Sequence, residues 1–180
     1  LRLRAVEVLA KDSASLTLAD MQVISDAVGR QLGDPGITGV VVLHGTDAME
    51  ETALLLALQH RSPKPVVLTG AQFAADHPQS DGIANLAQAL ATVLGGLAGV
   101  SLAFGGQAFP AWGLYKRASD RAQAFGRAGD GPAPELPLLP APVGGLRVDI
   151  IACPPGTDAL HLDASLAAGA QGLVLAALGS

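Results

Sequence analysis

The chain has 180 residues, of which 49% are apolar and 15% charged, and its net charge is −5. This composition excludes intrinsic disorder, and the lack of any Lys/Arg cluster argues against nucleic acid or a membrane as a partner. No apolar run approaches the roughly 18 residues that a transmembrane helix needs. We therefore expect one globular domain with a true core, or one domain and part of another.

Predicted strands and helices alternate along the first part of the chain. Residues 3–8 alternate apolar and polar side chains, which predicts a half-exposed strand. Thr17 and Asp20 have the spacing of a capping box, which predicts a helix that ends at residues 33–36. Apolar runs predict further strands at 40–43, 65–72 and 99–104, with helices at 48–59 and 81–94 between them.

This alternation predicts an α/β fold, in which a parallel sheet is flanked by helices on both faces. Ligands of such sheets bind at the carboxyl ends of the strands. Ser13, the pair Thr46–Asp47 and the stretch 70–72 each follow a predicted strand. We therefore expect them to converge on one edge of the sheet.

A change in composition divides the chain. We expect a first α/β domain over residues 1–126 and a Pro-rich linker over 127–146. Residues 147–180 then restart a strand–helix–strand pattern, which predicts the opening of a smaller second α/β domain. Because the chain starts with Leu1 and stops just after a predicted strand, we expect both domains to be truncated, the first lacking its first strand.

The junction at Thr46 and Asp47 has two interpretations. Either residue would cap the helix that follows, since free backbone N–H groups at a helix start accept such partners. One cap needs only one residue, however, and Glu50 and Glu51 already bring negative charge to the first turn. The pair is therefore also a candidate for chemistry.

Other polar residues give weaker signals. His60, His77 and His161 lack metal-ligand spacing, and no phosphate-binding loop is evident, so we expect neither metal nor cofactor. We expect His44 to form hydrogen bonds within the core and Asp81 to cap the helix at 82–94. Cys153 is the only cysteine. It excludes an intrachain disulfide, and we expect it to be buried and structural.

Several segments resemble one family in order along the chain. "HGTDAMEETA" at 44–53 is similar to the signature HGTDTMEETA of the bacterial L-asparaginase family, with Ala48 in place of the second threonine. Four further segments resemble other parts of that family: "DSASLT" at 12–17, "KPVVLTGAQ" at 64–72, "SDGIANL" at 80–86, and the stretch from Val148 onward.

The resemblance implies hydrolysis of the side-chain amide of L-asparagine to aspartate and ammonia, without metal or cofactor. Thr46 matches one of two threonines that face the substrate; the other belongs to a TGGTIA segment that would precede Leu1. Asp47 matches its neighbour, and Lys116 matches the family's catalytic lysine, although Tyr115 replaces a threonine. Ser13 matches the serine that holds the substrate α-carboxylate.

These residue types suit amide hydrolysis. A threonine hydroxyl is a weak nucleophile that needs a base, and a desolvated lysine gives up its proton readily enough to serve as one. Asp47 would orient Lys116 and pair with the substrate ammonium. Backbone N–H groups near Thr46 or Ala71 would stabilise the oxyanion. Ala14 stands where the family places a polar side chain that helps to bind the α-amino group.

Two other functions stay open. An amidotransferase subunit of the same fold would deliver ammonia to a tRNA-bound glutamate. A non-enzymatic amino-acid-binding homologue would explain the departures at Ala14, Ala48 and Tyr115. The resemblance also implies a homodimer or homotetramer acting on a small-molecule substrate, with the cytoplasm the favoured location and the periplasm an alternative.

Overall fold

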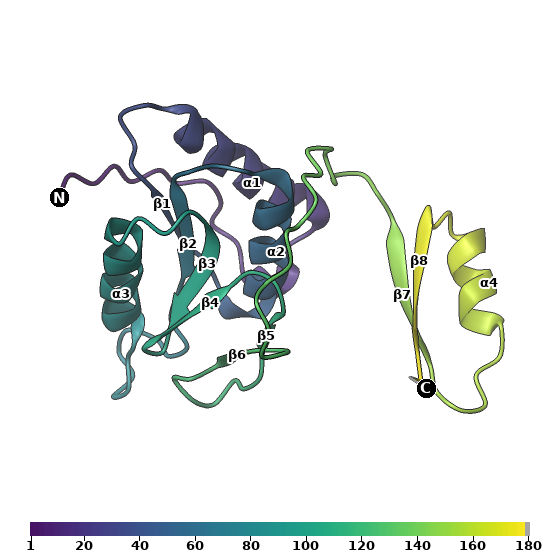
Figure 1. Cartoon of the computed structure of the whole chain (residues 1–180). Coiled ribbons are helices and arrows are strands. Elements are labelled where there is room, and N and C mark those ends of the chain that lie inside the picture. The colour runs from purple at the N-terminus through teal and green to yellow at the C-terminus, as the bar shows by residue number, and fades with distance from the viewer. Residues whose placement is uncertain (179–180) are drawn as a thin grey trace. The chain divides into compact units, whose positions relative to one another are not determined.

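The computed structural model describes residues 1–178, and the chain divides into two compact units. The first unit is Leu1–Pro142, and the second begins at Val143. Figure 1 shows the sheet of the first unit with α3 on one face and α1 and α2 on the other.

The four-stranded sheet of the first unit has the order β1-β2-β3-β4. The strands are β1 (Val40–Leu43), β2 (Pro65–Thr69), β3 (Gly99–Phe104) and β4 (Gln107–Pro110). β1, β2 and β3 are parallel, and β4 turns back antiparallel to β3. The expected parallel α/β sheet is therefore confirmed, with one antiparallel strand added at its edge.

The helices of this unit are α1 (Leu18–Gly33), α2 (Met49–Gln59) and α3 (Gly82–Leu94). All of β2 is buried, because its side chains point alternately to two cores. Val66 and Leu68 pack with α1 and α2, whereas Val67 packs with Ala89 of α3. Two cores on opposite faces explain why the strands are apolar throughout instead of alternating.

The capping box at the start of α1 is confirmed. The Thr17 hydroxyl accepts from the backbone N–H of Asp20 at 3.2 Å, and Asp20 Oδ2 accepts from the backbone N–H of Thr17 at 2.8 Å. Lys11 Nζ lies 2.6 Å from the same carboxylate oxygen. The hydrogen bond from Lys11, together with those from Thr17, lowers the pKa of Asp20 to about 2.

The predicted strand at residues 3–8 is wrong. The segment is exposed and forms no ladder with another strand in the described part of the chain. A groove of about 450 Å³ is lined both by residues 1–9 and by β1. Neighbouring strands lie only about 4.8 Å apart, so a segment across a groove cannot pair with β1. Residues 3–8 therefore alternate apolar and polar side chains but have no neighbouring strand to pair with within residues 1–178.

A hairpin follows the sheet in the first unit. It is made of β5 (Leu114–Lys116) and β6 (Phe125–Arg127), which pair antiparallel. Leu114 and Phe125 are buried in the same core as α2. This packing holds the hairpin against the helix and brings Lys116 to the end of α2 at which the helix begins.

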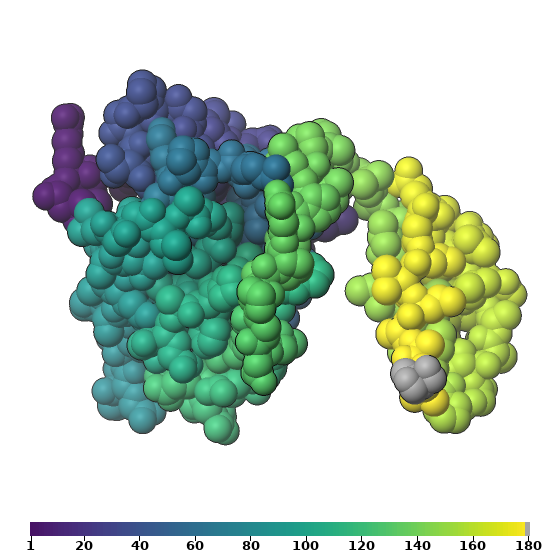
Figure 2. Space-filling view, viewed as in Figure 1, coloured from purple at the N-terminus to yellow at the C-terminus, as the bar shows by residue number. Residues whose placement is uncertain are grey.

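Residues 127–142 of the proline-rich stretch belong to the first unit, where Figure 2 shows them as light-green chain lying over its surface. The backbone N–H of Leu139 donates to the carbonyl of Leu58 at 2.7 Å, and Gln59 Nε2 donates to the carbonyl of Ala141 at 2.9 Å. The stretch is therefore fixed to the end of α2 as far as residue 141.

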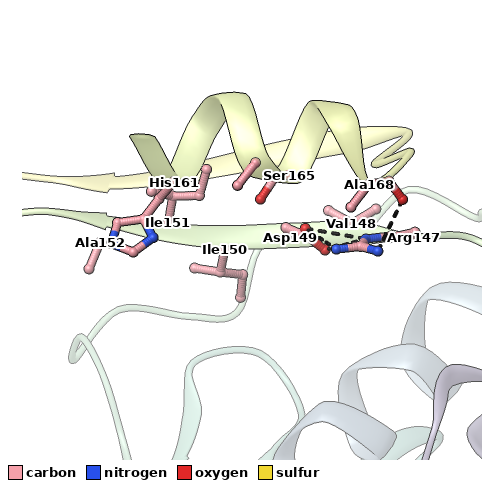
Figure 3. Close-up of a pocket in the computed structure, with 10 residues that line it drawn as sticks. Arg147, Val148, Asp149, Ile150, Ile151, Ala152, His161, Ser165 and Ala168 are labelled. Atoms are coloured by element: carbon pink, nitrogen blue, oxygen red, sulfur yellow. Dashed lines mark hydrogen bonds and ion pairs between the residues drawn. The ribbon is translucent and has the colours of Figure 1, made fainter. Parts of the chain in front are cut away.

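The second unit contains β7 (Val148–Cys153), α4 (Leu160–Ala167) and β8 (Gly172–Ala177), and its two strands are parallel. This is the expected strand–helix–strand pattern. Figure 3 shows His161 and Ser165 of α4 above β7, and Arg147 bonded to Asp149 and to the carbonyl of Ala168.

Cys153 is only partly buried, so the expectation of a buried thiol is wrong. Within residues 1–178, β7 pairs with β8 alone, and such a small sheet leaves its end residue accessible. No helix in that same range is long and apolar enough to cross a membrane.

Candidate active site

The turn from β1 into α2 carries the central residues. β1 ends at Leu43, a short 3₁₀ turn spans Thr46–Ala48, and α2 begins at Met49. Neither the 3₁₀ turn nor α2 has a side-chain cap bond at its start. The capping interpretation of Thr46 and Asp47 is therefore wrong, and both side chains are available for other contacts.

Lys116 supplies those contacts from the β5 strand. Its Nζ lies 2.8 Å from Thr46 Oγ1 and 2.6 Å from Asp47 Oδ1. The lysine side chain is 14% exposed, whereas that of Asp47 is 51% exposed. The cluster is therefore closed on the lysine side and open to solvent on the aspartate side.

Ser13 joins the cluster from the loop before α1. It is 4% exposed, and its Oγ accepts from the backbone N–H of Asp47 at 3.2 Å. Gly45 makes this approach possible, because a Cβ at that position would overlap the Ser13 hydroxyl. Among residues 1–178 the Ser13 hydroxyl serves only as an acceptor, which leaves its own proton for a ligand.

Ala71 occupies the neighbouring turn, after β2. Gly70 packs so tightly on the His44 carbonyl that a Cβ would overlap it, and the two turns therefore touch. Ala71 itself is exposed and forms no hydrogen bond with the lysine cluster in the described residues. The structure thus joins four of the five predicted site residues directly and places the fifth one turn away.

Asp81 stands at the N-cap position of α3, as expected, but its carboxylate makes no cap hydrogen bond and instead orders the turn that carries Ala71. Its carboxylate accepts from the backbone N–H groups of Gln72 at 3.0 Å and Phe73 at 3.1 Å. It also accepts from Asn85 Nδ2 at 2.9 Å, and the same amide nitrogen donates to the Gly70 carbonyl at 3.0 Å. Asp81 and Asn85 both belong to the segment "SDGIANL". Their hydrogen-bond partners lie earlier in the chain, in the turn at residues 70–73, so no local sequence pattern reveals these contacts.

His44 forms hydrogen bonds beside the site, as expected. Its Nδ1 lies 2.7 Å from the Gly45 carbonyl and its Nε2 lies 3.0 Å from Thr52 Oγ1. Burial lowers the pKa of His44, which favours the neutral ring. We therefore assign His44 a structural role, in which its hydrogen bonds hold the turn between β1 and α2.

Glu50 contacts Lys116, and the sequence analysis did not predict this contact. Its carboxylate accepts a hydrogen bond from the backbone N–H of Lys116. Burial raises the pKa of Glu50, and the neighbouring charge of Glu51 adds to the shift. The sequence shows only two acidic residues in a first helical turn, so nothing separates Glu50 from Glu51.

The fold is an α/β sheet whose strand-to-helix turn carries Thr46 and Asp47 in contact with Lys116. The family model for the asparaginase N-terminal domain matches residues 1–137. The chain belongs to the asparaginase family.

Relatives of two kinds are similar to this chain. An L-asparaginase of Bacillus licheniformis is 30% identical over 185 residues, which cover 93% of this chain and 57% of that enzyme. A glutamyl-tRNA(Gln) amidotransferase protein of Pyrobaculum aerophilum is 44% identical over 90 residues, covering 49% of this chain and 21% of that protein.

A solved structure supports the fold. A probable cytoplasmic L-asparaginase of Campylobacter jejuni matches with a TM-score of 0.81 and 28% identity, over 96% of this chain and 64% of that chain. The present chain thus spans less than two thirds of the length of each of these proteins.

Proposed function

We propose that the protein hydrolyses the side-chain amide of L-asparagine to aspartate and ammonia. One observation carries the proposal: Lys116 Nζ lies within hydrogen-bond distance of both Thr46 Oγ1, at 2.8 Å, and Asp47 Oδ1, at 2.6 Å. A nucleophile, a base and a group that orients the base are the parts that acyl transfer needs.

The proposed reaction has two steps. The Thr46 oxygen bonds to the amide carbon while its proton passes to the amine of Lys116. The C–N bond then breaks, and the same proton leaves with ammonia, so that an ester remains on Thr46. Water hydrolyses the ester and restores the hydroxyl. No metal or cofactor takes part in these steps.

The exposed side of the cluster suits an amino acid. Asp47 is half exposed, and we assign its carboxylate to the substrate ammonium. The Ser13 hydroxyl, which accepts from Asp47 N–H, has its proton free to donate to the α-carboxylate. The backbone N–H of Ala71, in the adjoining turn, is our assignment for the oxyanion.

The departure at Tyr115 does not weaken this proposal. Successive residues of a strand point to opposite faces, so Tyr115 and Lys116 diverge. The tyrosine ring lies by Gly126 on β6, where an added Cβ would come within 3.2 Å of it. Tyr115 therefore leaves the lysine cluster unobstructed. This argues against a degenerate, non-enzymatic homologue.

The second candidate is an ammonia-supplying amidotransferase component. The 44% identity to the Pyrobaculum aerophilum protein over 90 residues favours it. Both functions require the same amide cleavage and differ in the acceptor of ammonia. Free asparagine hydrolysed by the intact protein alone supports the first function. Ammonia release that requires a partner protein and glutamyl-tRNA supports the second.

Two properties stay predictions. We expect a homodimer or homotetramer, which light scattering coupled to size-exclusion chromatography would measure. We also propose a cytoplasmic location, the one given for the Campylobacter jejuni relative.

A further inference from the structure

Lys116 is held at its backbone as well as at its ammonium. It is the last residue of β5, and its backbone N–H donates to the carboxylate of Glu50 in the first turn of α2. The sequence separation is 66 residues, so this contact exists only through the fold.

The backbone N–H of Lys116 has no partner in its own hairpin. The backbone N–H of Arg117, the next residue, donates to the Ala124 carbonyl at 2.8 Å. This bond continues the hydrogen-bond ladder between β5 and β6. In an antiparallel pair, adjacent N–H groups point to opposite edges, so Lys116 N–H points away from β6. Glu50 thus occupies the edge of β5 that no strand covers in the described part of the chain.

One short piece of chain therefore fixes both ends of the lysine. Thr46 and Asp47 contact its Nζ, and Glu50 contacts its backbone. A lysine side chain has four flexible methylene groups, so two anchors define the position of the amine far better than one. Thr46 lies in the 3₁₀ turn and Glu50 in the first turn of α2, so one continuous segment of chain carries both the nucleophile and the anchor.

We propose that Glu50 is a positioning residue, which places the amine of Lys116 against Thr46 by holding the lysine backbone. This inference rests on the proposed function, because it assigns Lys116 to the reaction.

The surroundings of Glu50 support a functional reason for its carboxylate. It is partly buried next to Glu51, and burial raises its pKa, which means that the charged form costs stability in the fold. Glu51 is exposed and adds the same charge to the same helical turn. If charge at the start of the helix were all that mattered, Glu51 would serve and Glu50 would be dispensable.

The test compares variants of the intact protein in asparagine hydrolysis. Glu50→Ala removes the acceptor, and we expect kcat to fall about 10- to 100-fold, as small misplacements of reacting groups do, with KM changed less than about threefold. Glu50→Gln keeps an acceptor oxygen, so kcat should recover to within roughly tenfold of the parent protein. Glu51→Ala is the matched control and should keep the parent kcat.

A double-variant cycle tests whether Glu50 acts through the lysine. In a Lys116→Met background, adding Glu50→Ala should change the residual kcat by less than about twofold, because the group being positioned is gone. An equal loss in both backgrounds would overturn the inference. Equal losses from Glu50→Ala and Glu51→Ala would overturn it too, since helix charge would then explain both.

Backbone amide exchange tests the contact without relying on activity. The Lys116 amide should exchange at least about tenfold faster in Glu50→Ala than in Glu51→Ala. Unchanged protection would overturn the inference even in an active enzyme. If the parent protein hydrolyses no asparagine, the proposed function fails, and amide exchange still decides whether Glu50 holds the backbone. Glu50→Leu, which keeps the side-chain bulk but offers no acceptor, provides the same measurement if Glu50→Ala does not fold.

Discussion

Lys116 Nζ lies 2.6 Å from Asp47 Oδ1, although 69 residues separate the two in sequence. The lysine is 14% exposed and the aspartate 51%. The pair therefore joins a sheltered amine to an accessible carboxylate. Such an arrangement leaves the outer side of the carboxylate free to contact the ammonium of an amino acid from solvent, while the lysine stays against Thr46.

The first prediction follows from that pair. Lys116→Met removes the base and should lower kcat about 10²- to 10⁴-fold, the range that general acid–base groups contribute. Lys116→Arg should not rescue it, because a guanidinium does not give up a proton at neutral pH. Ammonia release from asparagine is the measurement.

Lys64 provides the control for that variant. Its Nζ donates to the carbonyls of Leu32 at 2.8 Å and Asp34 at 2.7 Å, just before β2 begins and away from the lysine cluster. Lys64→Met should therefore lower the melting temperature and leave kcat within about twofold. Loss of kcat in Lys64→Met alone would contradict the assignment of the base.

The second prediction concerns Ser13. Ser13→Ala removes the acceptor for Asp47 N–H and the proposed donor to the α-carboxylate. Losing a hydrogen bond to a charged group costs roughly 1.5–3 kcal/mol, or about 10- to 150-fold in affinity. We expect that loss to appear mainly in KM for asparagine. Ser15→Ala, at an exposed position two residues on, should leave KM unchanged.

The third prediction is a pH dependence of stability at the start of α1. The pKa of Asp20 is lowered from 3.8 to about 2, chiefly by Lys11 and then by Thr17. A lowered acid pKa stabilises the fold above the unfolded value, and that contribution is lost as the pH falls toward the folded value. Asp20→Asn should therefore melt below the parent protein at pH 7, and the gap should close as the pH falls from about 4 to about 2.

Lys11→Met gives the matching check, because it removes the largest cause of the shift. In a Lys11→Met background, Asp20→Asn should lower the melting temperature at pH 7 by less than it does in the parent protein. If Asp20→Asn lowers the melting temperature of the protein as much at about pH 2 as at pH 7, this explanation is contradicted.

Local patterns predicted much of the fold. The Thr17–Asp20 box is a pattern within one turn, and α1 begins where it indicates. The apolar runs became β1, β2 and β3 because each packs against neighbours on both faces, although only β2 is buried along its whole length. Residues 3–8 show the limit: alternation describes one segment, but a strand requires a partner beside it.

The site divides in the same way. Thr46 and Asp47 were visible as two adjacent polar residues at a strand-to-helix junction, yet capping fitted them equally well. Lys116 was found only through the family resemblance, since no spacing links it to Thr46. Glu50 was missed because it acts on a backbone N–H, and a backbone group leaves no mark in the sequence.

The central claim is that Thr46 is the nucleophile, and Thr46→Val tests it most directly. Valine keeps the branched shape and removes the hydroxyl that lies 2.8 Å from Lys116 Nζ. Thr38→Val, at an exposed loop position, is the matched control. In the intact protein we expect Thr46→Val to lose at least about 10³-fold in asparagine turnover with its melting temperature preserved, whereas Thr38→Val keeps full activity. Turnover by Thr46→Val close to that of the parent protein would contradict the account.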